Sequence, residues 1–385
     1  MTELPRIQRL SDVLISQIAA GEVVERPSSI IKELIENSLD AGARRVDLLL
    51  KDGGIAEISV LDDGHGISEV DLPLAIERHA TSKVSRLEDL EAIHTFGFRG
   101  EALASIASVA TLEITSRTAQ MEKAASVQVE YGKVSPVQYV AAPSGTRVTV
   151  RGLFEKIPAR LKFLRSPGTE LSHCTRVLKE LALGNPEVAF FLHHQGKLVC
   201  SFAAGDRLSR FTDCFKPQWE PLHFEEAATG LSAEGFLSPA HHMADRGEIS
   251  LFINGRPVRQ KTLTSAVRNA YLNTLGPHHE PSGFIFLDVQ ADWIDVNVHP
   301  QKWEVRILRQ DSLYAWLMGC LRRLLESAKK DLAPVLFPEE LNRPVGTGSA
   351  PTTLSAFSFS APASGLYRYL GTVREAFGFM KLRRA

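Results

Sequence analysis

Two short polar segments, Glu33–Asn37 and Asp62–Gly66, constrain most strongly what this chain can fold into. The first lies within residues 27–41, where apolar side chains recur at helical spacing. Since residues four apart share one face of a helix, Glu33 and Asn37 are expected to lie side by side. The second segment follows an apolar run that alternates like a strand, which places its acidic residues at the open end of a predicted hairpin.

The remaining pattern predicts helices and strands with one long unpatterned stretch. Strands are expected at residues 46–50, 56–60, 111–116 and 146–150, as pairs within 125–140 and 190–202, and at 231–237, 248–253 and 283–290. Helices are expected at residues 27–41, 101–109, 171–183, 262–275 and 312–330, the first capped by Ser28 or Ser29. Residues 72–100 have weak periodicity, and a loop of this length inside a compact domain is typical of a lid.

The length of 385 residues suits two domains and a tail. A weak boundary near Gly205 separates a domain over residues 1–205 from a second over 206–331. Residues 332–365 are rich in Pro, Gly, Ser and Thr, which predicts a disordered linker. Residues 366–385 turn apolar and aromatic again and resemble the start of a further domain that the chain does not complete.

The composition says more about the cellular compartment of the chain than about its binding partners. A net charge of -1 argues neither for nor against nucleic acid, so only local clusters of basic residues can indicate it. The four cysteines are far apart and lack metal-type spacing, which fits a reducing compartment. The N-terminus lacks an apolar signal core, and no run of about 18 apolar residues occurs, which predicts a cytoplasmic chain without a membrane span.

Glu33 and Asn37 supply side chains that hydrolysis of a phosphoanhydride needs. A carboxylate such as Glu33 can orient and deprotonate the attacking water. The amide oxygen of Asn37, one turn away, suits Mg²⁺, which prefers oxygen ligands, retained waters and substrate phosphates. Glu36 and Asp40 are expected to be solvated or structural. An isolated pair at this spacing is more often a solvated helix face, so the prediction depends on the other segments.

Asp62 ends a predicted strand, where a buried carboxylate can accept a hydrogen bond from the exocyclic amine of adenine. Gly64 and Gly66 would let the backbone pass close to a flat base. Thr146, which follows Gly145 at the start of another strand, could share a water with Asp62 and the base. Taken alone, each of these features is also an ordinary turn or strand end.

The segment Gly97–Glu101 combines two glycines with the start of a predicted helix. Glycines let backbone amides curl around a phosphate, and the positive end of the helix would face the anion. The chain contains no G-x-x-x-x-G-K-[ST] motif, which excludes a P-loop. Together the segments predict a nucleotide-hydrolysing site of another architecture.

Basic residues gather in runs that could follow a nucleic-acid backbone. The runs comprise Arg160, Lys162 and Arg165; Arg256, Arg259, Lys261 and Arg268; and Arg322, Arg323, Lys329 and Lys330. Any one run is usually a solvated face, whereas two or three that converge on one groove would form a sequence-independent phosphate track. No base-reading motif is visible, so binding to DNA is expected to be non-specific.

In their order along the chain, these segments resemble the GHKL ATPases and, among those, the MutL family of DNA mismatch-repair proteins. The motifs that carry the resemblance are Ile18–Pro27, Lys32–Leu34, Glu36–Gly42, His79–Lys83, Gly97–Leu103, Pro158–Arg160, Lys162–Leu164, Asn254–Arg256 and Asp295–Pro300. The resemblance implies an α+β chain, with an N-terminal Bergerat-type (GHKL) α/β sandwich ATPase domain. A smaller α+β domain similar to the ribosomal-protein and gyrase second-domain fold would follow.

The resemblance also implies roles for individual residues. It makes Glu33 the general base, Asn37 the Mg²⁺ ligand and Asp62 the adenine contact. The lid over the phosphates would comprise His79, Thr81, Ser82 and Lys83 together with Gly97, Phe98, Arg99, Gly100 and Glu101. Lys302 would reach the γ-phosphate from the second domain, where a cation that contacts only the terminal phosphate could distinguish ATP from ADP.

The implied function is an ATP-driven switch, or matchmaker, that binds ATP and Mg²⁺ and hydrolyses ATP slowly in mismatch repair. ATP binding would pair two copies into a homodimer, partly through residues 1–20. The implied partners are DNA, a mismatch-recognition protein and a downstream endonuclease and helicase, in the bacterial cytoplasm near the nucleoid. The metal motif of the family's nicking endonuclease is absent, so no endonuclease site is expected, and residues 366–385 would begin the family's dimerisation domain.

Asp63 departs from the family pattern, which usually has Asn at this position. It is expected to face away from the nucleotide because its neighbour Asp62 faces inward. Two other functions stay open, namely a non-enzymatic DNA-binding repair scaffold with a degenerate nucleotide site and the ATPase half of a type II topoisomerase. A histidine kinase is least favoured, since no phosphoacceptor helix pair precedes the site.

Overall fold

The computed structural model describes residues 24–83, 96–97, 100–130, 132–240, 247–272, 281–290, 293–295 and 306–336, and two short strands beyond them. The described residues up to Leu332 belong to one compact unit, and those from Ala333 on belong to another. In the second unit, β17 (Tyr367–Tyr369) pairs antiparallel with β18 (Leu382–Arg384). The predicted site residues Phe98, Arg99 and Lys302 lie outside the described residues, as do residues 1–20.

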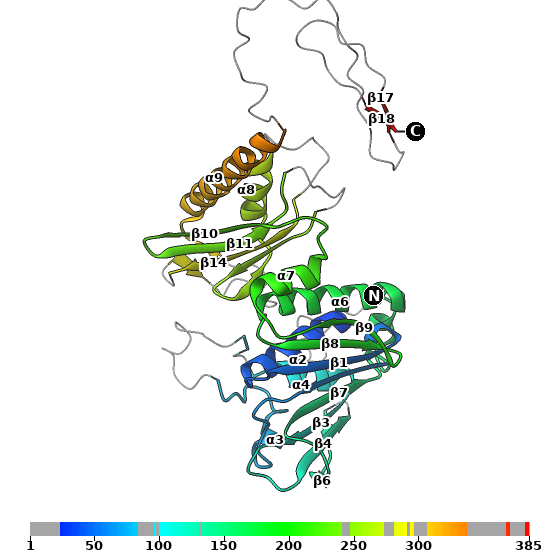
Figure 1. Cartoon of the computed structure of the whole chain (residues 1–385). Helices are drawn as coiled ribbons and strands as arrows, with labels where there is room; N and C mark the ends of the chain where they lie inside the picture. The colour runs from blue at the N-terminus through cyan, green and yellow to red at the C-terminus, as the bar shows by residue number, and fades with distance from the viewer. Residues whose placement is uncertain are drawn as a thin grey trace, which may run out of the picture. The chain divides into compact units, whose positions relative to one another are not determined.

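Nine strands in the first part of the described chain form one sheet (Figure 1). They are β1 (Arg45–Lys51), β2 (Glu57–Asp62), β3 (Thr111–Arg117), β4 (Ala124–Glu130), β5 (Lys133–Val134), β6 (Gln138–Val140), β7 (Gly145–Arg151), β8 (Ala189–His194) and β9 (Lys197–Phe202). Their order is β5–β4–β3–β7–β2–β1–β8–β9, with β6 beside β4. The predicted hairpin is β1–β2, which η1 (Asp52–Gly54) connects, and β8 adds parallel to β1.

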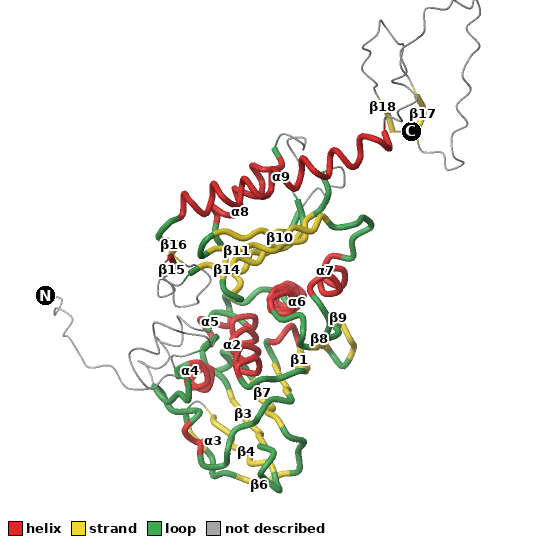
Figure 2. The backbone as a smooth tube through the Cα atoms, turned by 60° about the vertical axis from the view of Figure 1, so that its left-hand side comes forward, coloured by secondary structure: helices red, strands yellow, loops and turns green. Residues whose placement is uncertain are grey.

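Helices cover one face of this sheet (Figure 2). The covering helices are α2 (Pro27–Asp40), α4 (Ala102–Val109) and α6 (Pro167–Gly184), and two short helices, α3 (Asp71–Leu74) and α5 (Pro158–Leu161), lie in connections. The apolar residues of α2 that pack into the core are Ile30, Ile31, Leu34 and Ile35, each at most 2% exposed. Burial of this stripe fixes the rotation of α2 and leaves Glu33 and Asn37 outside the core.

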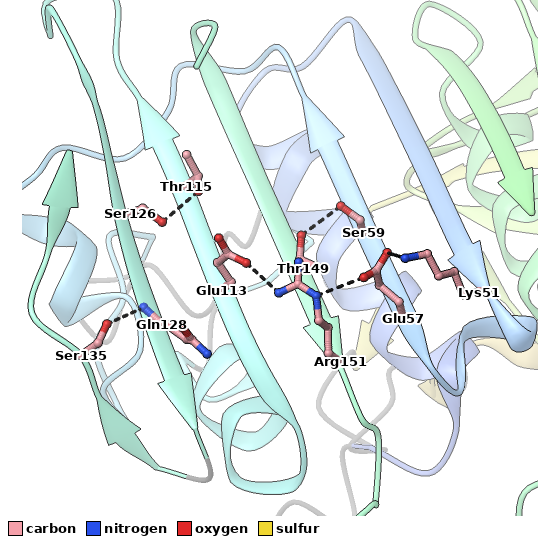
Figure 3. Close-up of polar contacts among 10 residues, drawn as sticks. All are labelled: Lys51, Glu57, Ser59, Glu113, Thr115, Ser126, Gln128, Ser135, Thr149 and Arg151. Atoms are coloured by element: carbon pink, nitrogen blue, oxygen red, sulfur yellow. Dashed lines mark hydrogen bonds and ion pairs between the residues drawn. The ribbon is translucent and has the colours of Figure 1, made fainter. Parts of the chain in front are cut away.

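The other face of the sheet carries a ladder of polar contacts (Figure 3). Arg151 on β7 donates from Nη1 to Glu113 of β3 at 2.7 Å and from Nε to Glu57 of β2 at 3.0 Å. The hydroxyls of Ser59 and Thr149 lie 3.1 Å apart across β2 and β7. These cross-strand pairs support the register in which β2 ends beside the start of β7.

A second, smaller sheet follows α7 (Arg207–Phe215). Its described strands are β10 (Leu222–Ala228), β11 (Leu231–Leu237), β12 (Ile249–Ile253), β13 (Arg256–Val258) and β14 (Gly283–Val289), in the order β10–β11–β14–β12–β13. Helices α8 (Lys261–Tyr271) and α9 (Gln310–Leu336) pack against it and share one apolar core with its strands. The short strands β15 (Ile294–Asp295) and β16 (Arg306–Ile307) pair before α9 begins.

An aromatic cluster joins the second sheet to α6 and α7. Its buried members are Leu183, Phe211, Phe236, Phe252, Phe284 and Phe286. Beside it, Arg210 is only 1% exposed, and its guanidinium donates to backbone carbonyls of Ala182, Asn185, Pro186, Val188 and Ala203. Burial lowers the pKa of Arg210. These carbonyls lie on the segments at the end of α6 and around β8 and β9, so one side chain ties α7 to the larger sheet.

The arrangement confirms the α+β class and most predicted elements, with three corrections. The N-cap of α2 is Arg26, so neither Ser28 nor Ser29 caps it, because the chain is already helical at Pro27. Helix α6 begins before the predicted residue 171, at Pro167, where Ser166 caps it. Finally, the elements α3, α5, α7, β10, β13, β15 and β16 were not predicted. Most of them are too short to show a period, whereas in α7 Leu208, Phe211 and Phe215 recur at helical spacing, a signal that the sequence did offer.

Three negative observations apply to the described part of the chain. None of its helices is long and apolar enough to cross a membrane. Its four cysteines are free thiols. No three His, Cys, Asp or Glu side chains converge there to hold a metal ion.

Candidate nucleotide site

Glu33 lies on the open side of α2 with an accessible carboxylate. Its side chain retains 22% exposure, and its Oε1 lies 3.8 Å from Nζ of Lys32. Lys32 pairs more closely with Glu36, at 2.8 Å, and both of those side chains are almost fully buried. Glu36 is therefore structural, as predicted, whereas Glu33 keeps the accessibility that a general base requires.

The carboxylate of Asp62, at the end of β2, is held by three donors. Ser38 Oγ donates to Oδ2 at 2.8 Å, and the N–H of Gly64 donates to Oδ1 at 3.0 Å. The N–H of Thr146 on β7 also donates to Oδ1, at 3.2 Å. Burial raises the pKa of Asp62, and these hydrogen bonds oppose the rise. Because Ser38 follows Asn37 on α2, one helix positions both the predicted metal ligand and the predicted adenine contact.

The turn after Asp62 packs tightly against neighbouring backbone. Gly66 has a φ of +75°, and a Cβ there would lie 2.4 Å from the carbonyl oxygen of Arg117. A Cβ at Gly64 would lie 2.8 Å from the Cβ of Ala41. The fold itself therefore requires both glycines, and their contact with a base stays a prediction.

Thr146 lies opposite Asp62 in the register of β2 and β7. Its hydroxyl is 2.9 Å from that of Ser116 on β3, and Ser116 Oγ also accepts from the N–H of Ile67 at 2.7 Å. Sequence reasoning missed both Ser116 and Ser38. The place of Ser38 beside Asn37 was the one available signal, whereas Ser116 joins the site only through strand pairing. The water-sharing role of Thr146 stays a prediction.

Asp63, the neighbour of Asp62, turns towards the start of β1. It is exposed, and its Oδ1 accepts from the backbone N–H groups of Arg44 at 2.7 Å and Arg45 at 2.9 Å. The expected outward orientation of Asp63 is therefore confirmed. The physical reason is local, because the first amides of β1 need acceptors and Asp63 supplies one.

Both ends of the predicted lid meet at Asp40, the last residue of α2. The Asp40 carboxylate is 5% exposed and accepts from the N–H groups of Phe96 at 2.9 Å and Gly97 at 3.1 Å. The ammonium of Lys83 lies 2.5 Å from Asp40 Oδ2 and 2.9 Å from Asn37 Oδ1. Asp40 is thus structural, and it fastens both lid segments to the helix that carries the predicted metal ligand.

The two lid segments also contact each other directly. The N–H of His79 donates to the carbonyl of Gly100 at 3.1 Å, and His79 Nδ1 lies 3.4 Å from Glu101 Oε1. His79 and Gly100 both have positive φ, at 65° and 62°. Thr81 and Ser82 are exposed between these contacts and Lys83. The described lid residues therefore gather at one end of α2, and their contact with phosphate stays a prediction.

The predicted DNA-binding residues lie in different surroundings. Lys162, Lys261 and Arg268 are exposed. Arg160 is half-buried, with its guanidinium 5.5 Å from the ring centre of Phe154. The exposed residues have the accessibility that contact with a phosphate backbone needs, and DNA binding stays a prediction for all of them.

Arg256 and Arg259, at β13 and just after it, interact with carboxylates of α2 and α6. Burial lowers the pKa of Arg256, and the charges of Glu36 and Asp40 oppose that change. Arg259 Nη2 lies 3.5 Å from Oε1 of Glu180 on α6. These two arginines therefore link the second sheet electrostatically to α2 and α6, a role that the sequence did not indicate.

Comparison with known proteins agrees with this geometry. Residues 25–148 match the family described as histidine kinase-, DNA gyrase B- and HSP90-like ATPase, and residues 216–326 match the C-terminal domain family of DNA mismatch repair proteins. The chain is 46% identical to the DNA mismatch repair protein MutL of Pseudomonas paraeruginosa, over 91% of this chain and 57% of that protein. It is 39% identical to MutL of Xylella fastidiosa, over 95% of this chain and 60% of that protein.

Solved structures show the same fold. The Aquifex aeolicus MutL ATPase domain complexed with ADP aligns with a TM-score of 0.57 and 27% identity, over 77% of this chain and 98% of that one. The N-terminal domain of a DNA repair protein aligns with a TM-score of 0.71 over 83% of this chain and 99% of that one. Its identity of 23% supports a likeness of fold alone.

The helix-covered sheet, with Asp62 at the end of β2 and Glu33 and Asn37 on α2, defines an ATPase domain of the GHKL class. More narrowly, the chain belongs to the MutL family of DNA mismatch-repair proteins. It spans about three fifths of the length of the curated relatives described above, at 57% and 60%. The predicted family and fold are confirmed, and the roles of individual residues stay predictions.

Proposed function

We propose that this chain is an ATP-dependent switch of DNA mismatch repair that binds ATP with Mg²⁺ and hydrolyses it slowly. The observation that supports this most is the fixed Asp62 carboxylate, which α2 holds through Ser38 while the same helix carries Glu33 and Asn37. A purine at Asp62 would direct its phosphates along α2 towards Glu33. The ADP named with the Aquifex aeolicus MutL ATPase domain supports nucleotide binding by this fold.

Asp62 would select adenine through its remaining acceptor capacity. An ionised carboxylate has about four acceptor sites, and three donors already fix its orientation. The exocyclic amine of adenine would donate to the carboxylate, whereas guanine has a carbonyl at that position. Gly64, Gly66 and Thr146 would line the same end of the site.

The side-chain oxygens of Asn37 and Asp40 suit a cation, because they already bind the ammonium group of Lys83. The Lys83 ammonium bonds to Asn37 Oδ1 and to Asp40 Oδ2, which is oxygen chemistry that also suits Mg²⁺. Asn37 would therefore be the protein ligand, with phosphates and waters completing the coordination. Bound Mg²⁺ would supply charge neutralisation at the phosphates.

Glu33 would act as the general base. Its carboxylate would accept a proton from the water whose oxygen attacks the γ-phosphorus, while the bond from that phosphorus to the bridging oxygen breaks towards ADP. Lys302 and the lid residues, including Phe98 and Arg99, would enclose the phosphates. Turnover would be slow because lid and domain movements limit it.

ATP binding would couple this site to DNA and to other repair proteins. The proposed non-specific DNA contacts are the exposed residues Lys162, Lys261 and Arg268, together with Arg160 and Arg259. Arg256 belongs to the predicted set, although its surroundings favour the contact with α2. The proposed partners are a second copy of the chain, a mismatch-recognition protein and a downstream endonuclease and helicase.

The test of this function is ADP formation from Mg-ATP by the purified chain. Glu33→Gln is expected to lower turnover at least ~100-fold, the lower range for loss of a general base, while ATP binding stays within about twofold. Glu122→Gln, at an exposed position two residues before β4, is the matched control and should turn over normally. Normal turnover in Glu33→Gln would remove the base assignment.

Two further outcomes decide between functions. If the wild-type chain forms no ADP, the non-enzymatic scaffold is the better account. Light scattering with and without a non-hydrolysable ATP analogue tests the homodimer, whose mass should double when the analogue binds. An unchanged mass would show that the chain does not pair in response to nucleotide.

A further inference from the structure

A pocket of about 240 Å³ lies beside Glu33, towards the N-terminal end of α2. Its charged lining comprises Arg26, Lys32, Arg176 and Arg259, with the carboxylates Glu25 and Glu33. Arg176 comes from α6, and Arg259 comes from the segment before α8, so three parts of the fold enclose the space. Ser28, Ser29 and His173 add polar groups.

The pocket gathers positive charge. Lys32 is paired with Glu36, and Arg259 lies 3.5 Å from Glu180. Within the described residues, neither Arg26 nor Arg176 forms an ion pair with a carboxylate. Arg176 Nη2 lies 3.4 Å from Nδ1 of His173, so neither guanidinium is held by a carboxylate and both can bind an anion in the pocket.

The imidazole of His173 feels the charges of several guanidiniums at once. Burial lowers the pKa of His173, and the charges of Arg26, Arg176 and Arg259 lower it further, whereas the charge of Glu170 opposes them. Three cations, from the N-cap of α2, from α6 and from the segment before α8, thus lie around one polar space. Guanidinium groups bind phosphate through paired hydrogen bonds, so this is a lining that suits an oxyanion.

The position of Glu33 connects this pocket to the proposed reaction. Ser29, Glu33 and Asn37 are spaced by four residues, so they follow one another along α2. Glu33 therefore separates the proposed Mg²⁺ ligand on one side from the cation-lined pocket on the other. A phosphate formed beside Glu33 would have this pocket as its neighbour on the side away from Asn37.

We infer that the pocket receives the inorganic phosphate that ATP hydrolysis produces, an inference that rests on the proposed function. In the reaction, the water oxygen bonds to the γ-phosphorus, the bridging bond breaks to give ADP, and the water proton moves to Glu33. Protonated Glu33 is neutral, which leaves Glu25 as the remaining charged carboxylate of the pocket lining. The charge of the pocket becomes attractive to the product at the moment when the product forms.

The size of the pocket agrees with this ligand. Sites for whole drug-sized ligands enclose about 300–1,000 Å³, and a water occupies about 30 Å³. A pocket of about 240 Å³ is too small for a nucleotide but holds a phosphate with several waters. Inorganic phosphate is therefore a better fit than ATP or a nucleic-acid strand.

The experiment is titration of the full chain with inorganic phosphate in the presence of Mg-ADP, followed by ³¹P line broadening. The wild-type chain should bind phosphate saturably. Arg176→Gln should weaken that binding about tenfold, because it removes a charge-assisted hydrogen bond from an exposed position that the fold does not need. Arg147→Gln, an exposed arginine on β7 outside the pocket, is the matched control and should bind as the wild type does.

Glu33→Gln is expected to change the phosphate affinity in the opposite direction. It removes the negative charge as protonation would, so phosphate should bind several-fold more tightly than to the wild-type chain. A general loss of structure cannot tighten binding, so this variant separates the pocket from a folding defect. Equal phosphate affinity in Arg176→Gln and Arg147→Gln, or weaker binding in Glu33→Gln, would overturn the inference.

A single-turnover measurement of ATP cleavage keeps this inference separate from the proposed function. If the wild-type chain cleaves ATP but Arg176→Gln leaves the phosphate affinity unchanged, the phosphate site is refuted and the proposed function stands. If phosphate affinity follows the expected pattern but ATP is not cleaved, the hydrolytic function fails, and with it the source of phosphate that the inference names.

Discussion

The ammonium of Lys83 lies 2.9 Å from the amide oxygen of Asn37, the residue proposed to hold Mg²⁺. The same ammonium lies 2.5 Å from Asp40, which also accepts the N–H groups of Phe96 and Gly97. A Mg²⁺ ion bound at Asn37, as proposed, would therefore compete with Lys83 for this oxygen. Binding of Mg-ATP would displace Lys83 from α2 and loosen one of the contacts that fasten the lid segments to Asp40.

Asp40→Asn tests whether Asp40 fastens the lid. The variant loses the ion pair with Lys83 and weakens two hydrogen bonds to a charged acceptor. Exchange of the Phe96 and Gly97 amide protons should therefore accelerate at least ~10-fold, as measured by hydrogen exchange with mass spectrometry or NMR. Asp71→Asn, at the exposed start of α3, is the control and should leave both amides unchanged. Unchanged exchange in Asp40→Asn would contradict the fastening role.

The adenine assignment of Asp62 predicts a preference for ATP over inosine triphosphate. Inosine replaces the exocyclic amine with a carbonyl, which the carboxylate would repel instead of binding. Wild-type affinity should be at least ~10-fold higher for ATP, because a hydrogen bond to a charged group is lost. Asp62→Asn keeps an oxygen for Gly64 and Thr146 but offers an N–H to the ligand, so the preference should disappear. Equal wild-type affinities for the two nucleotides would refute the assignment.

The raised pKa of Asp62 also predicts how stability depends on pH. Its reference value in an unfolded chain is about 3.9, and burial makes the folded chain bind the proton more readily. Ionised Asp62 therefore opposes folding at neutral pH, and this cost declines as the pH falls through the raised pKa. Asp62→Asn removes the cost at every pH. Denaturant unfolding between pH 7 and 4 should show the variant losing its advantage, relative to the wild type, as the pH falls. A relative advantage that grows on acidification would contradict the sign of the shift.

Non-specific DNA binding should depend on exposed cations and on salt. Lys261→Gln combined with Arg268→Gln should reduce the slope of log affinity against log salt by about 1.8, if each residue neutralises one phosphate of duplex DNA. Arg256→Gln should leave the slope unchanged, because Arg256 faces Glu36 and Asp40. Lys197→Gln, exposed on β9, is the control. Fluorescence anisotropy at several salt concentrations measures all four proteins, and an unchanged slope in the double variant would remove α8 from the DNA surface.

The helix and hairpin that carry the site could be predicted because local rules and tertiary packing agree there. The apolar stripe of α2 faces the core, and the alternation in β1 and β2 matches their antiparallel register. The position of Asp62 at the open end of the β1–β2 hairpin followed directly from this register. The outward orientation of Asp63 could also be predicted, since neighbouring residues at a strand end point to opposite sides.

Contacts between distant segments could not be predicted in the same way. Ser116 reaches Thr146 only because β3 and β7 pair, and Asp40 meets Phe96 only because the chain returns to the end of α2. The orientation of Arg256 towards α2 depends on how the second sheet packs. The buried Arg210 was missed for a related reason, because its partners are backbone carbonyls, which leave no mark on side-chain patterns.

The central claim is that α2 and the end of β2 form one ATP site. Its most direct test is the dissociation constant of Mg-ATP for the wild-type chain and for Glu33→Gln, Asn37→Ala and Asp62→Asn. We expect Glu33→Gln to bind like the wild type and Asp62→Asn to bind at least ~10-fold more weakly. Asn37→Ala should weaken binding when Mg²⁺ is present and have little effect without it. Wild-type affinity in both Asn37→Ala and Asp62→Asn would contradict the claim.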